Sequence, residues 1–144
     1  MIKNIKFSVL VCLSLFFLAC SSNTNVEKSQ KPNVSLINNY WKVISLYGEK
    51  VKISRKEAHI RFEEAGSTNG SLGCNNFFGA YNIDKENITF KNVASTRMMC
   101  QNMKTEDSFS KVFQDTRKYK IKGETLIFFD GTNKEIAKFK VVYF

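Results

Sequence analysis

The sequence predicts an α+β domain in which a strongly curved antiparallel β-sheet, a partial barrel, packs on one amphipathic helix. Three observations lead to this prediction. From residue 40 onward, aromatic and β-branched residues alternate with polar ones, as in half-buried strands. Glycine, aspartate and asparagine interrupt these stretches at short intervals, which is typical of tight turns. Only residues 104–119 space their apolar side chains as a helix does.

The first predicted strands lie in YWKVISLYGEKVKI, residues 40–53, and in HIRFEE, residues 59–64. The first segment places aromatic and β-branched residues before Gly48, which indicates a strand followed by a turn. In the second, Ile60 and Phe62 share one face of the strand, and His59 and Arg61 share the other.

Two later segments predict hairpins. GAYNIDKENITF, residues 79–90, contains two strand pieces joined by a polar turn at residues 84–87. Residues 119–144 predict a three-strand meander with turns at Gly123 and at Asp130-Gly131. In its last strand the inward residues are Ala137, Phe139, Val141 and Tyr143, and the outward ones are Lys138 and Lys140.

The helix is predicted in KTEDSFSKVFQDTRKY, residues 104–119. Its apolar face is formed by Phe109, Val112, Phe113 and Thr116. Thr105 is the expected N-cap, and Glu106 and Asp107 fall in the first turn. Basic residues follow at 117 and 118, so the order of charges suits the helix dipole.

The first nineteen residues predict a lipoprotein signal peptide. Lys3 and Lys6 precede an apolar run over residues 7–18, which is shorter than the ~20 residues of a membrane-spanning helix. The run ends in Ala19-Cys20 and resembles a lipobox, which implies acylation of Cys20 and anchoring in the bacterial cell envelope. Ser21 follows where an inner-membrane lipoprotein has Asp, so the expected site is the outer membrane, facing the periplasm. An ordinary cleaved signal or an amino-terminal membrane anchor are the alternatives.

Residues 20–37 are then the lipidated cysteine and a flexible polar tether, and residues 38–144 form the domain. Without residues 1–19 the chain keeps 20 basic and 13 acidic side chains, a net charge of +7. The lysines at 118, 120 and 122 project from one face of a strand, and Lys138 and Lys140 from another. If these strands are neighbours they form a basic patch. Such lysines either discourage edge pairing or contact anionic lipid. The envelope location argues against nucleic acid as a partner.

Cys74 and Cys100 are the two cysteines that remain if Cys20 carries lipid. A structural disulfide is favoured in an oxidising compartment, and it would close a loop of about 27 residues. Free thiols and a redox pair are the alternatives, but the chain has no Cys-x-x-Cys. His59 is the only histidine, and its distance from the cysteines does not suit a zinc site. We expect no metal and no cofactor.

Two dense motifs allow a structural and a functional interpretation. GCNNFFGAY, residues 73–81, is either a glycine-bent strand in the core or a ligand pocket lined by Asn76, Phe78 and Tyr81. In ASTRMMC, residues 94–100, Arg97 is expected beneath the helix. There it either pairs with Glu106 or Asp107, or it recognises an anion or a partner. Met98 and Met99 are expected to fill the core.

NGSLGCNNFFGAY followed by ASTRMMC, then Thr105-Glu106 and Phe109 on a helix, resembles the META domain, the HslJ-type heat-shock lipoprotein family. The resemblance covers about residues 38–144. It implies a compact α+β domain with one helix held in a curved sheet, similar to the fold of secretin pilotins. Members are often envelope lipoproteins linked to heat or antibiotic stress, and no enzymatic activity is established for the family. The hallmark residues bring no known chemistry to this chain.

The sequence therefore favours a non-enzymatic envelope lipoprotein that supports envelope integrity, assembly or stress tolerance by binding a protein. Its candidate binding residues are Asn76, Phe78, Tyr81 and Arg97. An alternative is a binder of lipid or another hydrophobic ligand, in a groove between helix and sheet. A third hypothesis is an enzyme acting on envelope polymers, although no catalytic set of residues is recognisable.

Overall fold

The computed structural model of the protein describes residues 34–53 and 55–144. Cys20, the predicted signal peptide and residues 21–33 of the tether lie outside this range. The described chain forms nine strands and one helix: β1 (Tyr40–Leu46), β2 (Glu49–Lys50), β3 (His59–Phe62), β4 (Ser67–Ser71), β5 (Asn76–Asp84), β6 (Asn87–Ser95), α1 (Lys104–Asp115), β7 (Lys118–Lys122), β8 (Thr125–Phe129) and β9 (Glu135–Val142).

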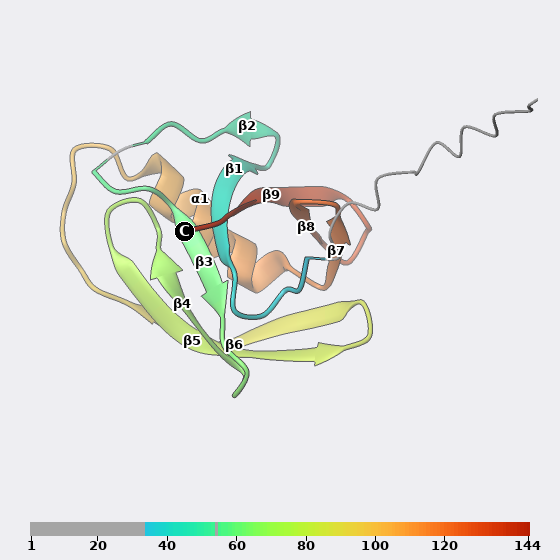
Figure 1. Ribbon diagram of the computed structural model, residues 1–144. Helices are drawn as coiled ribbons and strands as arrows, with labels where there is room; N and C mark the ends of the chain where they lie inside the picture. The colour runs from blue at the N-terminus through green and yellow to red at the C-terminus, as the bar shows by residue number, and fades with distance from the viewer. Residues whose placement is uncertain (1–33, 54) are drawn as a thin grey trace, which may run out of the picture.

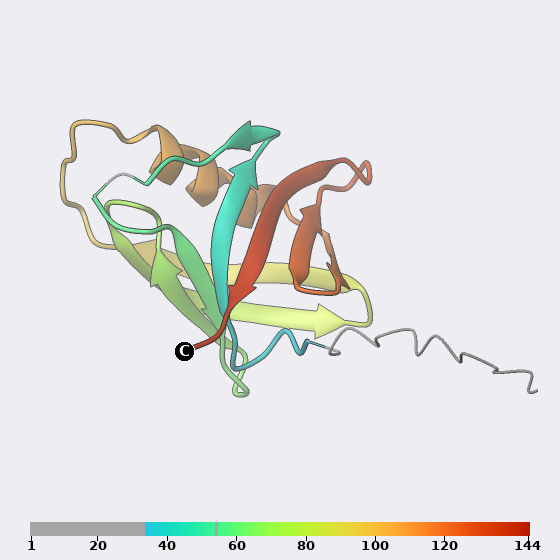
Figure 2. The same ribbon diagram turned by 45° about the horizontal axis from the view of Figure 1, so that its top comes forward.

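All strands belong to one antiparallel sheet in the order β2-β1-β3-β4-β5-β6-β7-β8-β9, and β1 also pairs with β9. The sheet therefore curls back on itself, with α1 beside it (Figures 1 and 2). The ring is strong on one side, where six residue pairs join β1 to β9. It is weak on the other, where Asn87 opposite Lys118 is the one pair between β6 and β7. The predicted fold class, a strongly curved antiparallel sheet packed on one helix, is confirmed, although the sheet forms a ring and not a barrel.

Phenylalanine rings from sheet and helix fill the interior. Phe109 lies 5.8 Å from both Phe77 and Phe139, measured between ring centroids, and Phe113 lies 4.8 Å from Phe77. The side chains of Phe109 and Val112 are completely buried, which confirms the predicted apolar face of the helix. Edge-to-face and tilted contacts of this kind add roughly 0.5–1.5 kcal/mol per pair beyond area burial.

The core reaches back into the predicted tether. Val34 and Leu36 are buried, and the indole Nε1–H of the buried Trp41 donates a 2.9 Å hydrogen bond to the carbonyl oxygen of Leu36. Trp41 needs an acceptor for its buried N–H, so it fixes this segment against the sheet. Residues 34–37 thus belong to the domain and not to a flexible linker.

Two other expectations about the elements are wrong. The residue before α1 is Met103, which makes no side-chain cap, and Thr105 lies inside the first turn. Tyr143 was expected to face inward, but 59% of its surface is exposed. The reason is that β9 ends at Val142, opposite the first residue of β1, so Tyr143 has no strand to cover it. The inward positions Ala137, Phe139 and Val141 are buried as predicted.

Candidate functional site

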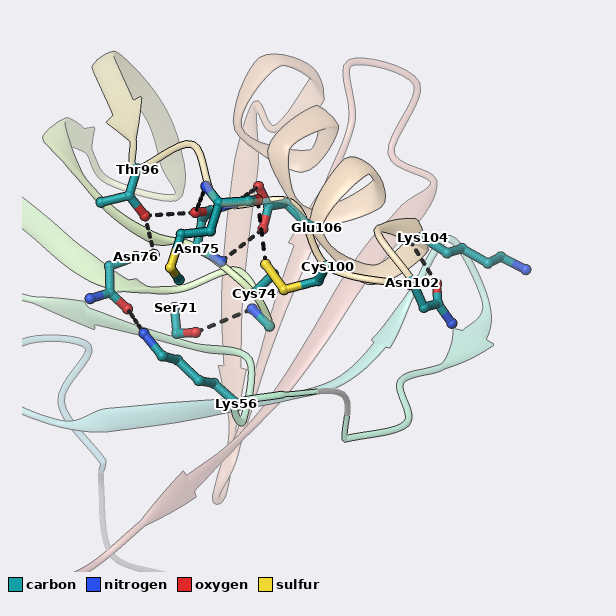
Figure 3. The surroundings of a disulfide bond; sticks show 12 residues. Lys56, Ser71, Cys74, Asn75, Asn76, Thr96, Cys100, Asn102, Lys104 and Glu106 are labelled. Atoms are coloured by element: carbon teal, nitrogen blue, oxygen red, sulfur yellow. Dashed lines mark hydrogen bonds between the residues drawn. A yellow bond between two sulfur atoms is a disulfide. The ribbon is translucent and has the colours of Figure 1, made fainter.

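The GCNN stretch joins three parts of the chain. Cys74 and Cys100 form a disulfide, with their Cα atoms 6.3 Å apart. This is the bridge that the sequence favoured. It ties the start of β5 to the loop between β6 and α1 (Figure 3). On the chain-entropy model, a bridge across 26 residues stabilises the fold by roughly 3–4 kcal/mol.

Asn75 is the centre of a buried hydrogen-bond network that we call the Asn75 clasp: Asn75, Thr96, Met98 and Glu106. The backbone N–H of Asn75 donates to Glu106 Oε2 at 2.8 Å, and its amide Nδ2 donates to Glu106 Oε1 at 2.8 Å. Nδ2 also donates to the carbonyl oxygen of Met98 at 2.9 Å. Oδ1 accepts from the Thr96 hydroxyl and from the Met98 N–H, each at 2.7 Å.

Glu106 is the buried carboxylate of the clasp. Only 9% of its surface is exposed, and a buried carboxylate needs hydrogen-bond donors close by. Asn75 supplies two of them (Figure 3). From the sequence, Glu106 or Asp107 was expected to pair with Arg97, and the contact with Asn75 was not expected. The sequence does indicate that Glu106 is buried, because residues 106, 109 and 113 follow helical spacing. This spacing places Glu106 on the buried face of α1.

Arg97 is exposed and makes no ion pair within the described residues, so its predicted burial beneath the helix is wrong. The two methionines beside it are exposed as well, Met98 by 38% and Met99 by 90%. They do not fill the core. The physical reason is that the Met98 backbone N–H and carbonyl both bond to Asn75, which holds the backbone of this loop against β5 and leaves the side chains outside.

The candidate binding residues of β5 lie on opposite faces of the strand. Asn76 and Phe78 point outward, and 66% of the Phe78 surface is exposed. Tyr81 points inward, where its ring packs edge-on against the buried Phe62 and its hydroxyl donates to the carbonyl oxygen of Glu63. Burial raises the pKa of Tyr81, and the nearby Glu63 adds to the effect. The structure therefore does not bring Asn76, Phe78 and Tyr81 into one pocket, and β5 is not buried on both faces.

Asn76, Phe78 and the loop do share the outer surface. Phe78 lies opposite Ala94 in the β5–β6 ladder, and the Thr96 N–H donates to the Asn76 carbonyl oxygen. Side chains of residues 76 and 78 therefore stand beside the segment that leads to residues 97–99. We call the group Asn76, Phe78, Arg97 and Met99 the loop surface.

A separate groove runs between α1 and β6, with a volume of about 360 Å³. Its apolar lining is Leu72, Phe90, Val93, Ala94 and Phe113, and its polar lining includes Ser95, Ser110 and Gln114. The alternative prediction from the sequence was a hydrophobic ligand bound between helix and sheet, and this groove lies there.

Tyr40, Glu57 and His59 form a polar cluster on the outer face of the sheet. Tyr40 stacks on His59 with ring centroids 4.2 Å apart and donates to Glu57 at 3.1 Å. Burial, with the hydrogen bond to Glu57, raises the pKa of Tyr40 to about 12. Burial lowers the pKa of His59, so the imidazole is neutral at pH 7. Lys42 forms an ion pair with Glu57.

The imidazole of His59 is held by its stacking on Tyr40. Across residues 34–53 and 55–144, no group of three or more His, Cys, Asp or Glu side chains is arranged to hold a metal ion. Within the same residues, no helix is long and apolar enough to cross a membrane.

The chain is similar to known proteins in sequence and in fold. The family model for the META domain matches residues 34–142. Heat shock protein HslJ of Escherichia coli K12 is 31% identical over 97 residues, which cover 67% of this chain and 66% of the relative. The chain thus spans just under two thirds of that relative's length.

Solved structures share the fold. An NMR structure with 23% identity superposes with a TM-score of 0.61 over 75% of this chain and 95% of the other. A second, from Burkholderia xenovorans, has 13% identity and a TM-score of 0.61 over 76% and 85%. A crystal structure of a DUF4847 family protein from Bacteroides vulgatus gives 0.55 over 73% and 93%, also at 13% identity.

Proposed function

Because this chain belongs to the META domain family, we propose that it is a non-enzymatic lipoprotein of the bacterial cell envelope that binds a partner protein and thereby supports envelope integrity, assembly or tolerance of heat and antibiotic stress. Its similarity to heat shock protein HslJ supports the link to stress. The lipobox-like end of its first twenty residues supports anchoring through Cys20, in the outer membrane and facing the periplasm.

The observation that carries protein binding is the exposure of the loop surface. Phe78 and Met99 expose 66% and 90% of their surfaces, and Arg97 beside Met99 is exposed too. Single exposed apolar residues are ordinary, but an aromatic, a methionine and an arginine together have the composition of interface hot spots. The disulfide and the Asn75 clasp hold the backbone beneath them, so a partner would meet a preorganised surface.

The test is crosslinking of the full chain in living cells, followed by affinity capture and mass spectrometry. We expect one dominant protein partner, and loss of most of it in a Phe78→Ala, Arg97→Ala, Met99→Ala variant. Tyr143→Ala is the matched control, because Tyr143 is an exposed aromatic outside the loop surface. Unchanged capture by the triple variant would contradict binding through this surface.

The membrane anchor has its own test. Cys20→Ala should move the protein from the membrane fraction to the soluble fraction of the cell, because the acyl chains would be lost. Continued membrane association of this variant would contradict lipidation at Cys20.

The groove between α1 and β6 supports a second candidate, the binding of a lipid or another hydrophobic ligand. The groove offers apolar side chains together with a few polar groups, a combination that small-molecule sites use. A fluorescent fatty-acid probe should bind the full chain, and Ser110→Phe should abolish binding by filling the groove. Thr89→Phe, on the outer face of β6, is the control. Equal binding by both variants would exclude the groove.

A further inference from the structure

The outer face of β7, β8, β9 and β1 carries two rows of lysines. Strand register places Lys122, Thr125, Lys140 and Lys42 opposite one another in turn. The second row is Lys120, Ile127, Lys138, Ser45 and Lys50. The strands of the two predicted lysine groups, β7 and β9, are not neighbours, since β8 lies between them. The face is still positive across all four strands, because β8 places only uncharged residues between the lysines of β7 and β9, and β1 adds Lys42. We call these six lysines, 42, 50, 120, 122, 138 and 140, the lysine face.

The positive charge of this face is only partly neutralised. Glu57 pairs with Lys42, and Glu135 pairs with Lys138 at 3.1 Å. In the part of the chain that the structure describes, Lys120, Lys122 and Lys140 are exposed and have no carboxylate within ion-pair distance. Lys140 stands directly opposite Lys42, an arrangement of like charges that destabilises a strand pair. An external anion would relieve this repulsion.

The chemistry of the face selects the kind of anion. From β7 to β1 there are three strand spacings, about 15 Å in all, so the fields of the lysines overlap over roughly one to two Debye lengths. All six cations are lysines, which act as point charges, whereas specific recognition of phosphate or nucleic acid favours the bidentate fork of arginine. The central apolar side chain, Ile127, is 7% exposed and offers no ring on which a base could stack. The face therefore suits diffuse attraction to a surface of many negative charges.

We propose that the lysine face binds the anionic headgroup surface of a phospholipid bilayer. This interaction is separate from the partner-binding loop surface and from the acyl anchor. It would hold this face of the sheet against the membrane instead of leaving the domain free on its tether. Each lysine near an anionic surface raises the affinity severalfold, and the attraction falls as the ionic strength increases.

Lysine footprinting of the full chain tests the proposal site by site. The protein is bound to vesicles of phosphatidylcholine alone or of phosphatidylcholine with phosphatidylglycerol, and amine acetylation is read by mass spectrometry. On the anionic vesicles we expect acetylation of Lys120, Lys122 and Lys140 to slow by about fivefold or more, with recovery in high salt. Lys91 and Lys104 are exposed outside the face and serve as internal controls. Because each amine is read separately, a lipid anchor that holds the protein on both kinds of vesicle does not obscure the result.

Charge reversal gives an independent readout. Lys122→Glu with Lys140→Glu should restore fast acetylation at Lys120, whereas Arg55→Glu with Lys91→Glu changes the net charge equally and should leave the protection intact. Equal acetylation on neutral and anionic vesicles would overturn the proposal. So would protection by single-stranded DNA or polyglutamate that the anionic vesicles fail to give, since the face would then prefer a nucleic acid or an acidic protein.

Discussion

The adjacent residues Asn75 and Asn76 occupy opposite environments. Asn75 is 1% exposed and its side chain makes four hydrogen bonds within the clasp. Asn76 is exposed, and its side chain accepts one bond, from Lys56 at 3.0 Å. The same residue type is thus structural at one position and available for contacts at the next.

Asn75→Ala should destabilise the domain by about 3 kcal/mol or more, because it leaves Glu106 buried with fewer donors and removes the acceptor of the Met98 N–H. Asn76→Ala should cost no more than about 0.5 kcal/mol. Urea unfolding of the two variants under non-reducing conditions measures the difference. Similar losses for both would show that the clasp does not stabilise the fold.

The lowered pKa of His59 determines the direction in which the stability of the fold changes with pH. Burial lowers the pKa of His59 in the folded domain, so the unfolded chain binds this proton at a higher pH than the folded chain does. Stability should therefore fall as the pH decreases through the unfolded value of 6.5. His59→Gln should show a smaller loss of stability between about pH 7 and 5.5 than the unmodified chain. An equal or larger loss in the variant, measured by urea midpoints, would contradict this.

Glu57 adds to the same trend at lower pH. Its partial burial alone would raise its pKa, but hydrogen bonds from Lys42 and Tyr40 outweigh this effect and lower the pKa below 4.5. The stabilisation is present above the unfolded value and is lost as the pH falls through the folded one. Glu57 therefore titrates below the window in which His59 is tested.

Among the elements, β3 and β4 approach each other closely because of a glycine. A Cβ atom built at Gly70 would lie 2.1 Å from the carbonyl oxygen of His59. Backbone cannot move away as a flexible side chain can, so Gly70→Ala should separate the strands and cost about 2–4 kcal/mol. Gly131 is the matched control, since its nearest neighbour would be Arg117 Cγ at 3.8 Å. Thermal unfolding should distinguish the two alanine variants, and equal melting temperatures would disprove the close approach.

The elements also show what sequence patterns can predict. Alternation identified β1, β3, β5, β6 and the final meander, because their inward residues are large and apolar. The same test missed β4, STNGS, whose buried residues are Thr68 and Ser71. The burial of these small polar side chains is set by the fold and not by the strand's own composition.

Loops are less predictable for a related reason. The apolar residues Met98 and Met99 were expected in the core, because apolar side chains are buried more often than not. Their exposure depends on Asn75, more than twenty positions away, which holds the backbone of the loop. Sequence could therefore identify the disulfide pair but not the surface that surrounds it.

At the scale of the whole molecule, the ring has a seam between β6 and β7. The single residue pair there, Asn87 opposite Lys118, is made by two hydrogen bonds: the Ile88 N–H donates to the Arg117 carbonyl oxygen, and the Tyr119 N–H donates to that of Glu86, both at 2.9 Å. Few hydrogen bonds make a boundary where local opening is easiest.

We therefore predict that the Ile88 and Tyr119 amides exchange with deuterium faster than those of Lys42 and Lys140, which face one another where β1 and β9 pair. The prediction is demanding, because Ile88 is completely buried and accessibility alone would slow its exchange. Hydrogen exchange resolved by NMR gives the four rates. Equal protection on the two sides would mean that the ring opens only with global unfolding.

The pairing of β1 with β9 also determines when this domain can fold. About a hundred residues separate Val43 from its partner Phe139, so the first strand meets its main neighbour only after the last one has been made. Contacts this distant in sequence slow folding. A chain that emerges amino-terminus first, from a ribosome or through a membrane pore, has no ring to close until β9 is free. Trp41 meets Val141, its partner in β9, only then, so the chain stays open enough to pass through a pore until β9 has followed.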